Sequence, residues 1–276
     1  AGAYTVGGRL NNVAAADNYY IVSSTESVQK VINKAPLDIT WTGTSEFVYD
    51  KTLHAPEYTV SGGFGSDDTM ISIDGASIYA NAYTNTQYYT ATAVTSNSNY
   101  YITENTKSRR FTIAQREVTL SWLTDTIGYT GEELAPLVVL SSDNLIDGDA
   151  LRLSRTGFQR NTNEYTGIPE YIATAVVGNR NYKATAATAT KKFKIVPRNV
   201  SFVWDSAASF EYNGAVQYPK VTDIDGAVAT ELEALKASIS YTGGGKDVAG
   251  GSYTAFATLL NKNYSVVESS RTSGYY

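Results

Sequence analysis

The sequence predicts an all-β protein made of tandem two-sheet repeats of about 82 residues, arranged as an elongated rod. Three observations support this prediction. The composition is typical of strands, with 22 Tyr and 22 Gly in 276 residues and abundant Thr, Ser, Ala and Val. Apolar and polar residues alternate over short runs, and turn-forming residues separate these runs. The same residues return along the chain at a nearly constant spacing.

Three tryptophans mark the repeat. The spacing from Trp41 to Trp122, and from Trp122 to Trp204, is about 82 residues. Each tryptophan lies nine residues after an isoleucine and seven or eight residues before a tyrosine, and a proline follows that tyrosine by seven residues. In chain order the sets are Ile32, Trp41, Tyr49 and Pro56; Ile113, Trp122, Tyr129 and Pro136; and Ile195, Trp204, Tyr212 and Pro219.

An Asn-Tyr pair marks the second half of each repeat. The pairs are Asn99-Tyr100, Asn181-Tyr182 and Asn263-Tyr264, and the Tyr of each follows an earlier tyrosine (Tyr89, Tyr171, Tyr253) by eleven residues. A fourth copy near the start, Asn18-Tyr19, has a loop that is four residues longer. Because these tyrosines recur in phase, we expect Tyr100, Tyr182 and Tyr264 to pack in the core or at its corners, and we take them, with the three tryptophans, as the structural landmarks of the repeat.

The period sets the expected boundaries. Residues 1–35 are predicted to hold the last strands of a partial repeat, followed by repeats at 36–116, 117–198 and 199–276, the last without part of its final strand. Only one or two residues join neighbouring repeats, which restricts bending between them.

Within each repeat the pattern favours an immunoglobulin-like β-sandwich. Val118, Leu120 and Trp122 alternate with polar residues, as in a half-buried strand. Six or seven such short strands in about 82 residues suit that fold. The segment 229–236 consists of good helix formers and predicts a short helix, which leaves a β-grasp-like mixed repeat as the alternative.

The order of motifs resembles that of MBG-type and related bacterial immunoglobulin-like repeats of large cell-surface proteins. The matching elements are the turn Tyr212-Asn213-Gly214, the midpoint Gly148-Asp149, the strand 251–257 and the pair Asn263-Tyr264. The first full repeat departs from this pattern at Tyr49-Asp50-Lys51, which lacks the glycine. The resemblance implies an extracellular location on a bacterial cell, a spacer, stalk, filament or adhesive role, and no catalytic residues.

Composition also restricts the chemistry. The net charge of −5 argues against nucleic acid as a partner, and no apolar run is long enough to cross a bilayer. Cysteine is absent and His54 is the single histidine, so nucleophilic triads and zinc sites lack their usual residues. Glu231, Glu233 and the pair Glu132-Glu133 are interpreted as surface charge. We therefore predict that the protein is not an enzyme and needs no cofactor, with the possible exception of calcium.

Two candidate binding sites remain. Asp143, Asp147 and Asp149 lie within seven residues of one another, and closely spaced carboxylates in a loop are suitable Ca²⁺ ligands. Tyr79, Tyr83, Tyr88 and Tyr101 crowd the first full repeat, where exposed aromatic rings would stack on a sugar or contact another protein.

These features predict a structural extracellular protein that forms a stalk, surface layer or filament, with self-association or flanking repeats of the same protein as partners. One hypothesis is that a strand of one subunit completes the unfinished sheet of the next; the alternative, which we favour, is that both ends of the sequence are simply cut. The alternative is an adhesin that binds a glycan or a host protein through its Tyr-rich loops.

Overall fold

The computed structural model describes residues 2–6, 28–141, 144–205, 209–248 and 252–275. Strands make up 46% of the chain, and the described helices are short, which confirms the predicted all-β class. The chain forms two compact units. Unit 1 comprises Ala1–Arg116 and Asn179–Lys183, and unit 2 comprises Glu117–Gly178 and Ala184–Tyr276.

Unit 1 begins with an antiparallel pair of strands and continues with two sheets. The pair is β1 (Gly2–Val6) and β2 (Val28–Ile32). Residues 35–114, the first segment, form the sheet β5 (Glu57–Ser61), β3 (Ala35–Thr42), β8 (Tyr100–Ile102) and the sheet β4 (Glu46–Val48), β9 (Ser108–Ala114), β7 (Tyr89–Thr95), β6 (Ile71–Asp74). Both sheets contain one parallel pair, β3 with β8 and β4 with β9.

The second segment, residues 116–196, forms three sheets. They are β10 (Arg116–Val118) with β16 (Tyr182–Ala184); β11 (Leu120–Trp122) with β13 (Val138–Leu140); and β12 (Thr126–Gly128), β17 (Thr190–Val196), β15 (Tyr171–Val177), β14 (Leu153–Thr156). β12 and β17 are parallel, as β4 and β9 are in the first segment.

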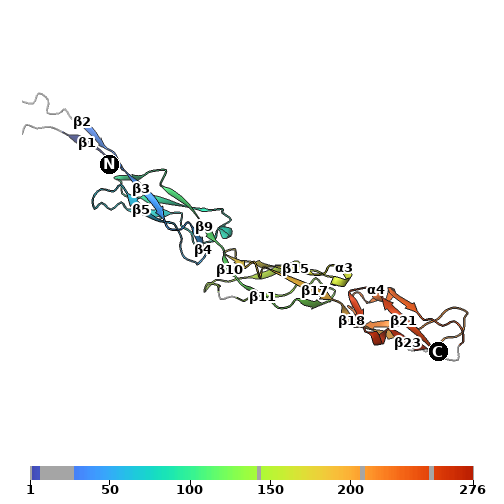
Figure 1. The fold of residues 1–276 in the computed structure, drawn as a ribbon. Helices are drawn as coiled ribbons and strands as arrows, with labels where there is room; N and C mark the ends of the chain where they lie inside the picture. Colours follow the sequence, from blue (N-terminus) through green and yellow to red (C-terminus); the bar gives the residue numbers. More distant parts are fainter. Residues whose placement is uncertain (1, 7–27, 142–143, 206–208, 249–251, 276) are drawn as a thin grey trace, which may run out of the picture. The chain divides into compact units, whose positions relative to one another are not determined.

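The third segment, residues 198–275, forms two three-stranded sheets (Figure 1). They are β19 (Val221–Asp225), β18 (Arg198–Trp204), β22 (Tyr264–Val266) and β20 (Ile239–Thr242), β21 (Tyr253–Leu259), β23 (Thr272–Tyr275). The parallel pairing of β18 with β22 matches that of β3 with β8. Equivalent strand pairings therefore follow the sequence repeat.

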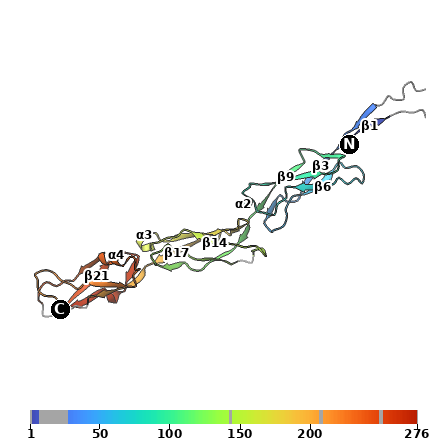
Figure 2. The same ribbon diagram turned by 180° about the vertical axis from the view of Figure 1, so that it is seen from behind.

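Helical turns are few among the described residues. They are α2 (Asn81–Thr84), α3 (Asn163–Thr166), α4 (Leu232–Ala237) and the 3-10 turn η1 (Glu268–Ser270). α4 overlaps the helix that the sequence predicts at 229–236. Its Leu235 is buried and packs against β19. Figures 1 and 2 both show α3 beside the start of the third segment, close to α4.

The core lies between facing sheets. In the first segment Leu37 and Ile39 from β3 pack with Ala93 from β7 and with Tyr100 and Ile102 from β8. Side chains of both sheets therefore share one apolar interior, which is a sandwich-like arrangement. Successive side chains of a strand point to opposite faces of the sheet, so the apolar residues at every second position are the ones that face this interior.

Each tryptophan ties a strand to the loop before the last strand. The Nε1–H of Trp41, Trp122 and Trp204 donates to the backbone oxygen of Thr106, Thr188 and Ser270 at 2.8, 2.9 and 2.7 Å. The hydroxyl oxygen of that same loop residue accepts from a backbone N–H of the tryptophan strand, at 3.1 Å from Leu120 in the second segment. This double link fixes the loop on the sheet.

Replacing the hydroxyl of this link should destabilise the fold. In Thr188→Val the buried N–H of Leu120 loses its acceptor, which we expect to cost about 1–3 kcal/mol. Thr188→Ser is the matched control, since Ser270 fills the equivalent position in the third segment. Chemical denaturation followed by tryptophan fluorescence measures both; equal midpoints for the two variants would contradict the role of the hydroxyl.

Candidate functional site

The candidate site is the place where the Asn-Tyr turn of one repeat packs on the preceding repeat, and it occurs twice in the part of the chain that the structure describes. In unit 1, Asn181 is buried and its Oδ1 accepts from the backbone N–H of Ala80 at 3.0 Å. In unit 2, Asn263 is buried and its Oδ1 accepts from the backbone N–H of Thr162 at 2.9 Å. A buried side-chain amide requires a hydrogen-bond partner, so each asparagine is buried only when its backbone donor is in place.

A tyrosine pair lies beside each buried asparagine. Tyr182 packs edge-on against Tyr49, with ring centroids 5.4 Å apart and an interplanar angle of 77°. Tyr264 meets Tyr129 in nearly the same way, at 5.3 Å and 76°. All four rings are buried. Edge-to-face contacts of this kind add to the burial energy, and they orient the two rings.

A one-turn helix connects each junction to the last strand of the preceding repeat. The Oδ1 of Asn81, the first residue of α2, accepts from the N–H of Ile113 in β9 at 2.6 Å. Asn163 of α3 accepts from Ile195 in β17 at 2.7 Å. The turns end in left-handed residues, Asn85 and Gly167, which is a common helix stop.

Asn81 and Asn163 were missed by the sequence reasoning. Their signal is present: Asn-x-Tyr-Thr occurs at 81–84 and again, one repeat later, at 163–166. Tyr83 belongs to this motif and is therefore in phase with Tyr165.

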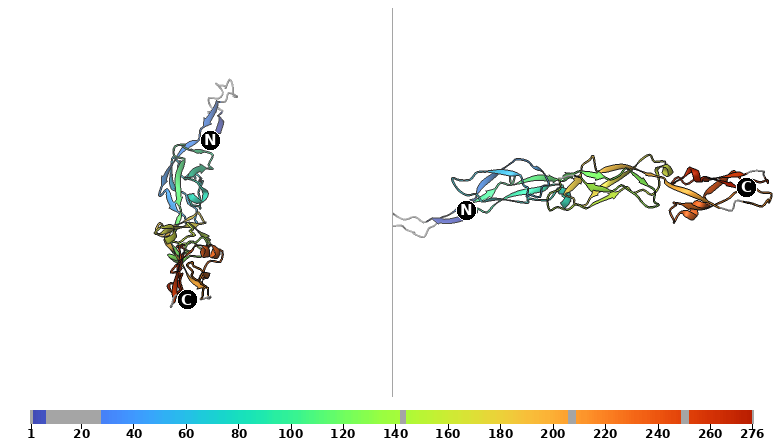
Figure 3. Two further views of the ribbon diagram at one scale, coloured as in Figure 1. Left: turned by 90° about the vertical axis from the view of Figure 1, so that its right-hand side faces the viewer. Right: turned by 90° about the horizontal axis from the view of Figure 1, so that it is seen from below.

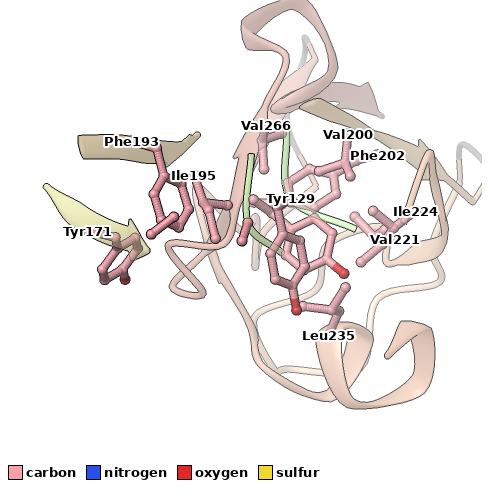
Figure 4. Close-up of a cluster of buried hydrophobic side chains, with 14 residues drawn as sticks. Tyr129, Tyr171, Phe193, Ile195, Val200, Phe202, Val221, Ile224, Leu235 and Val266 are labelled. Carbon is pink, nitrogen blue, oxygen red and sulfur yellow. The ribbon is translucent and has the colours of Figure 1, made fainter. Parts of the chain in front are cut away.

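The apolar core is continuous through the second junction. Figure 4 shows Tyr129 between Phe193 and Ile195 on one side and Val200 and Phe202 on the other. All five belong to one buried cluster that contains side chains from both the second and the third segment. The two segments of unit 2 therefore share part of their interior.

A carboxylate sits at this junction. Glu231 accepts hydrogen bonds from the hydroxyls of Tyr129 and Tyr264, both at 2.6 Å, and Arg160 lies 3.6 Å away. Burial and the adjacent carboxylate raise the pKa of Tyr129 to about 12, and the same causes raise the pKa of Tyr264 above its usual range. Our interpretation of Glu231 as surface charge was wrong, because its side chain is only 20% exposed and has two tyrosine partners.

The four candidate binding tyrosines are only partly brought together. Tyr79 and Tyr83 stack with centroids 4.7 Å apart, and both are exposed. Tyr88 lies under the guanidinium of Arg110 at 4.0 Å. Tyr101 is exposed on β8, which belongs to the three-stranded sheet with β3 and β5. The stacked pair is thus the part of this set with a shared surface.

The structure leaves the calcium prediction open. Asp143 lies outside the described residues, whereas Asp147 and Asp149 are described and have interactions within the chain. Within the described part of the chain, no three His, Asp or Glu side chains gather as a metal site. His54 is 2.8 Å from Asp50 and stacks on Phe47, which places it in local packing.

Comparison of the chain with family models, with curated proteins and with solved structures gives no match. Among the described residues, no helix has the length and apolar character that a membrane span requires. The geometry of the junctions is therefore the basis for the functional proposal.

Removing the buried carboxamide should weaken the second junction. In Asn263→Ala the N–H of Thr162 and the Oδ1 of Asn161 both lose a partner, so we expect a loss of about 1–3 kcal/mol in unfolding free energy. Lys262→Ala is the control, because that side chain is exposed and adjacent. Denaturant titration measures both variants, and equal stability would argue against a structural role for Asn263.

The tyrosine pair should make the protein sensitive to alkali. A tyrosine whose pKa is raised by folding holds its proton more tightly in the folded state than in the unfolded state. Its contribution to the free energy of unfolding is therefore fully present below about pH 10. It is lost as the pH rises toward 12, where Tyr129 ionises. Ultraviolet titration of tyrosinate should show late-ionising residues, and Glu231→Gln should shift them to lower pH. Glu233→Gln, at an exposed position of α4, should not.

Proposed function

We propose that the chain is a structural module of a bacterial cell-surface protein, in which immunoglobulin-like repeats of about 82 residues join end to end as a rod of a stalk, surface layer or filament. The observation that supports this most is the repetition of one junction. The same four interactions recur at sequence-equivalent positions: the buried Asn, the tyrosine pair, the helical turn and its tie to the last strand.

The junctions are built to resist bending. β9 ends at Ala114 and β10 begins at Arg116; β17 ends at Val196 and β18 begins at Arg198. A one-residue connection allows little rotation. Within unit 2, rotation of the third segment against the second also requires breaking the buried bond of Asn263, which costs about 1–3 kcal/mol. A rod of defined length is the function that such junctions serve.

Strand exchange between subunits is part of the proposal. β4 and β12 each pair in parallel with the last strand of their segment. A strand from another subunit would add to a sheet edge through main-chain hydrogen bonds of the same kind.

An adhesin is the second candidate, and the exposed stack of Tyr79 and Tyr83 favours it. Stacked, exposed rings form a flat apolar surface of the type that sugar rings contact. A glycan array probed with the full chain tests this function; loss of a bound glycan in Tyr83→Ala would support it, and no bound glycan would oppose it.

The rod proposal predicts a narrow distance distribution across the chain. The protein has no cysteine, so Leu53→Cys and Val216→Cys, both at exposed positions, introduce unique sites for spin labels. Pulsed electron paramagnetic resonance should give one narrow distribution, and adding Asn181→Ala with Asn263→Ala should broaden it.

The matched control changes the residue before each asparagine, Arg180→Ala with Lys262→Ala, because both side chains are exposed. The control should keep the narrow distribution. A broad distribution in the unmodified background would refute the rod.

A further inference from the structure

We propose that a groove at the junction of the second and third segments binds a neutral sugar unit of a polysaccharide. The groove lies within unit 2, and its volume of about 600 Å³ is inside the range of about 300–1,000 Å³ that is usual for ligand pockets. The right-hand view of Figure 3 shows the second segment, green to yellow, leading directly into the third, orange to red. This binding function goes beyond the structural one and does not depend on the rod.

Three parts of unit 2 form the groove. The helix α4 and its C-cap contribute Ala234 and Ser238, and α3 contributes Tyr165. The Asn-Tyr turn of the third segment contributes Leu260 and Asn261. The junction contacts described above hold these parts together, so the groove is preformed. A preformed site loses little conformational freedom when a ligand binds.

Hydrogen-bond donors are fixed in place along the groove. The Oδ1 of Asn161 accepts from the Nδ2 of Asn263 at 2.9 Å, and the Oδ1 of Asn261 accepts from the backbone N–H of Asn263 at 3.0 Å. Both oxygens are therefore occupied, which leaves the side-chain NH2 groups of Asn161 and Asn261 as donors to a ligand. The guanidinium of Arg160, whose side chain is 58% exposed, supplies further donors.

The acceptor of the groove is the carboxylate of Glu231. One of its oxygens accepts from the hydroxyl of Tyr129 and the other from the hydroxyl of Tyr264, so each oxygen keeps a second acceptor position. Arg160 and Glu231 are the two charged residues among the described ones that line the groove, and their charges cancel. The groove therefore favours a ligand that is polar and neutral.

Two exposed apolar side chains complete the site. Tyr165 is 53% exposed and Leu260 is 72% exposed, and both line the groove. Asn163 and Thr166, which belong to the same Asn-x-Tyr-Thr motif as Tyr165, are hydrogen-bonded within the fold. The Tyr165 side chain makes no hydrogen bond or ring contact with the described residues. Its ring is thus open to a ligand.

This combination of groups matches a sugar. A pyranose ring carries hydroxyls at its edge, each of which both donates and accepts, and it has C–H groups on its faces. The hydroxyls match the amide and guanidinium donors and the carboxylate acceptor, while the C–H groups pack on an aromatic ring. A lipid would leave the polar groups of the groove without partners. A charged ligand would gain little from a groove without net charge.

A glycan array probed with the full chain tests the ligand class. The array carries neutral hexose and N-acetylhexosamine oligosaccharides, with sialylated and sulfated oligosaccharides beside them. Multivalent display on the array reveals weak single-site binding. We expect binding to neutral oligosaccharides. Binding to none of them, or to anionic oligosaccharides alone, would overturn the proposal.

Two variants locate the bound sugar. Tyr165→Ala removes the exposed ring, and Ala234→Arg fills the groove from an exposed helical position. Each should weaken binding at least about tenfold in calorimetric titration with an oligosaccharide that the array identifies. Tyr165→Phe keeps the ring and should retain most of the affinity, because the ring packs on the sugar.

The matched controls are Tyr83→Ala, at the same position of the motif in the first segment, and Ala237→Arg, at an exposed position of α4 outside the groove lining. Neither should alter binding. Loss of binding in Tyr83→Ala with binding intact in Tyr165→Ala would assign the sugar to the stack of Tyr79 and Tyr83 and overturn the proposed groove. Broad label distances in a chain that still binds sugar would refute the rod alone, so the two proposals fail separately.

Discussion

The structure depends above all on a hydrogen bond between a buried carboxamide and a backbone N–H. Asn181 and Asn263 bring a polar group into a closed apolar environment, where it is tolerated only with its partner. The donors, Ala80 and Thr162, are the residues immediately before the one-turn helices α2 and α3. Each side of the junction therefore satisfies the other.

Around this bond the protein combines apolar and polar contacts. Tyrosine is the residue that supplies both, since its ring packs in the core while its hydroxyl reaches a partner. Tyr264 shows the combination: the ring meets Tyr129 and the hydroxyl reaches Glu231. Tyr100 does the same in the first segment, where its hydroxyl donates to Asp67 at 2.7 Å. The high tyrosine content reflects this dual use within a chain that has no disulfides.

Much of the fold was predictable because period-2 patterns and in-phase aromatic residues report burial directly. The all-β class, the helix near residues 229–236 and the burial of Tyr182 and Tyr264 follow from these signals. The junction was harder to predict, because partners about 100 residues apart, such as Tyr129 and Glu231, share no local pattern. Glu231 lies in a run of good helix formers, and nothing in that run indicates that the hydroxyls of Tyr129 and Tyr264 reach it.

The parallel pairing of terminal strands has a mechanical consequence. In the second segment β12 runs parallel to β17, the strand through which the chain leaves, and in the third β22 runs parallel to β18, the strand through which it enters. Tension along the chain pulls β17 and β18 along their own axes, while their hydrogen bonds lie across that direction. The bonds of each pair are then sheared together and do not open one after another, so a stretched chain holds its folded length until a whole strand pair yields.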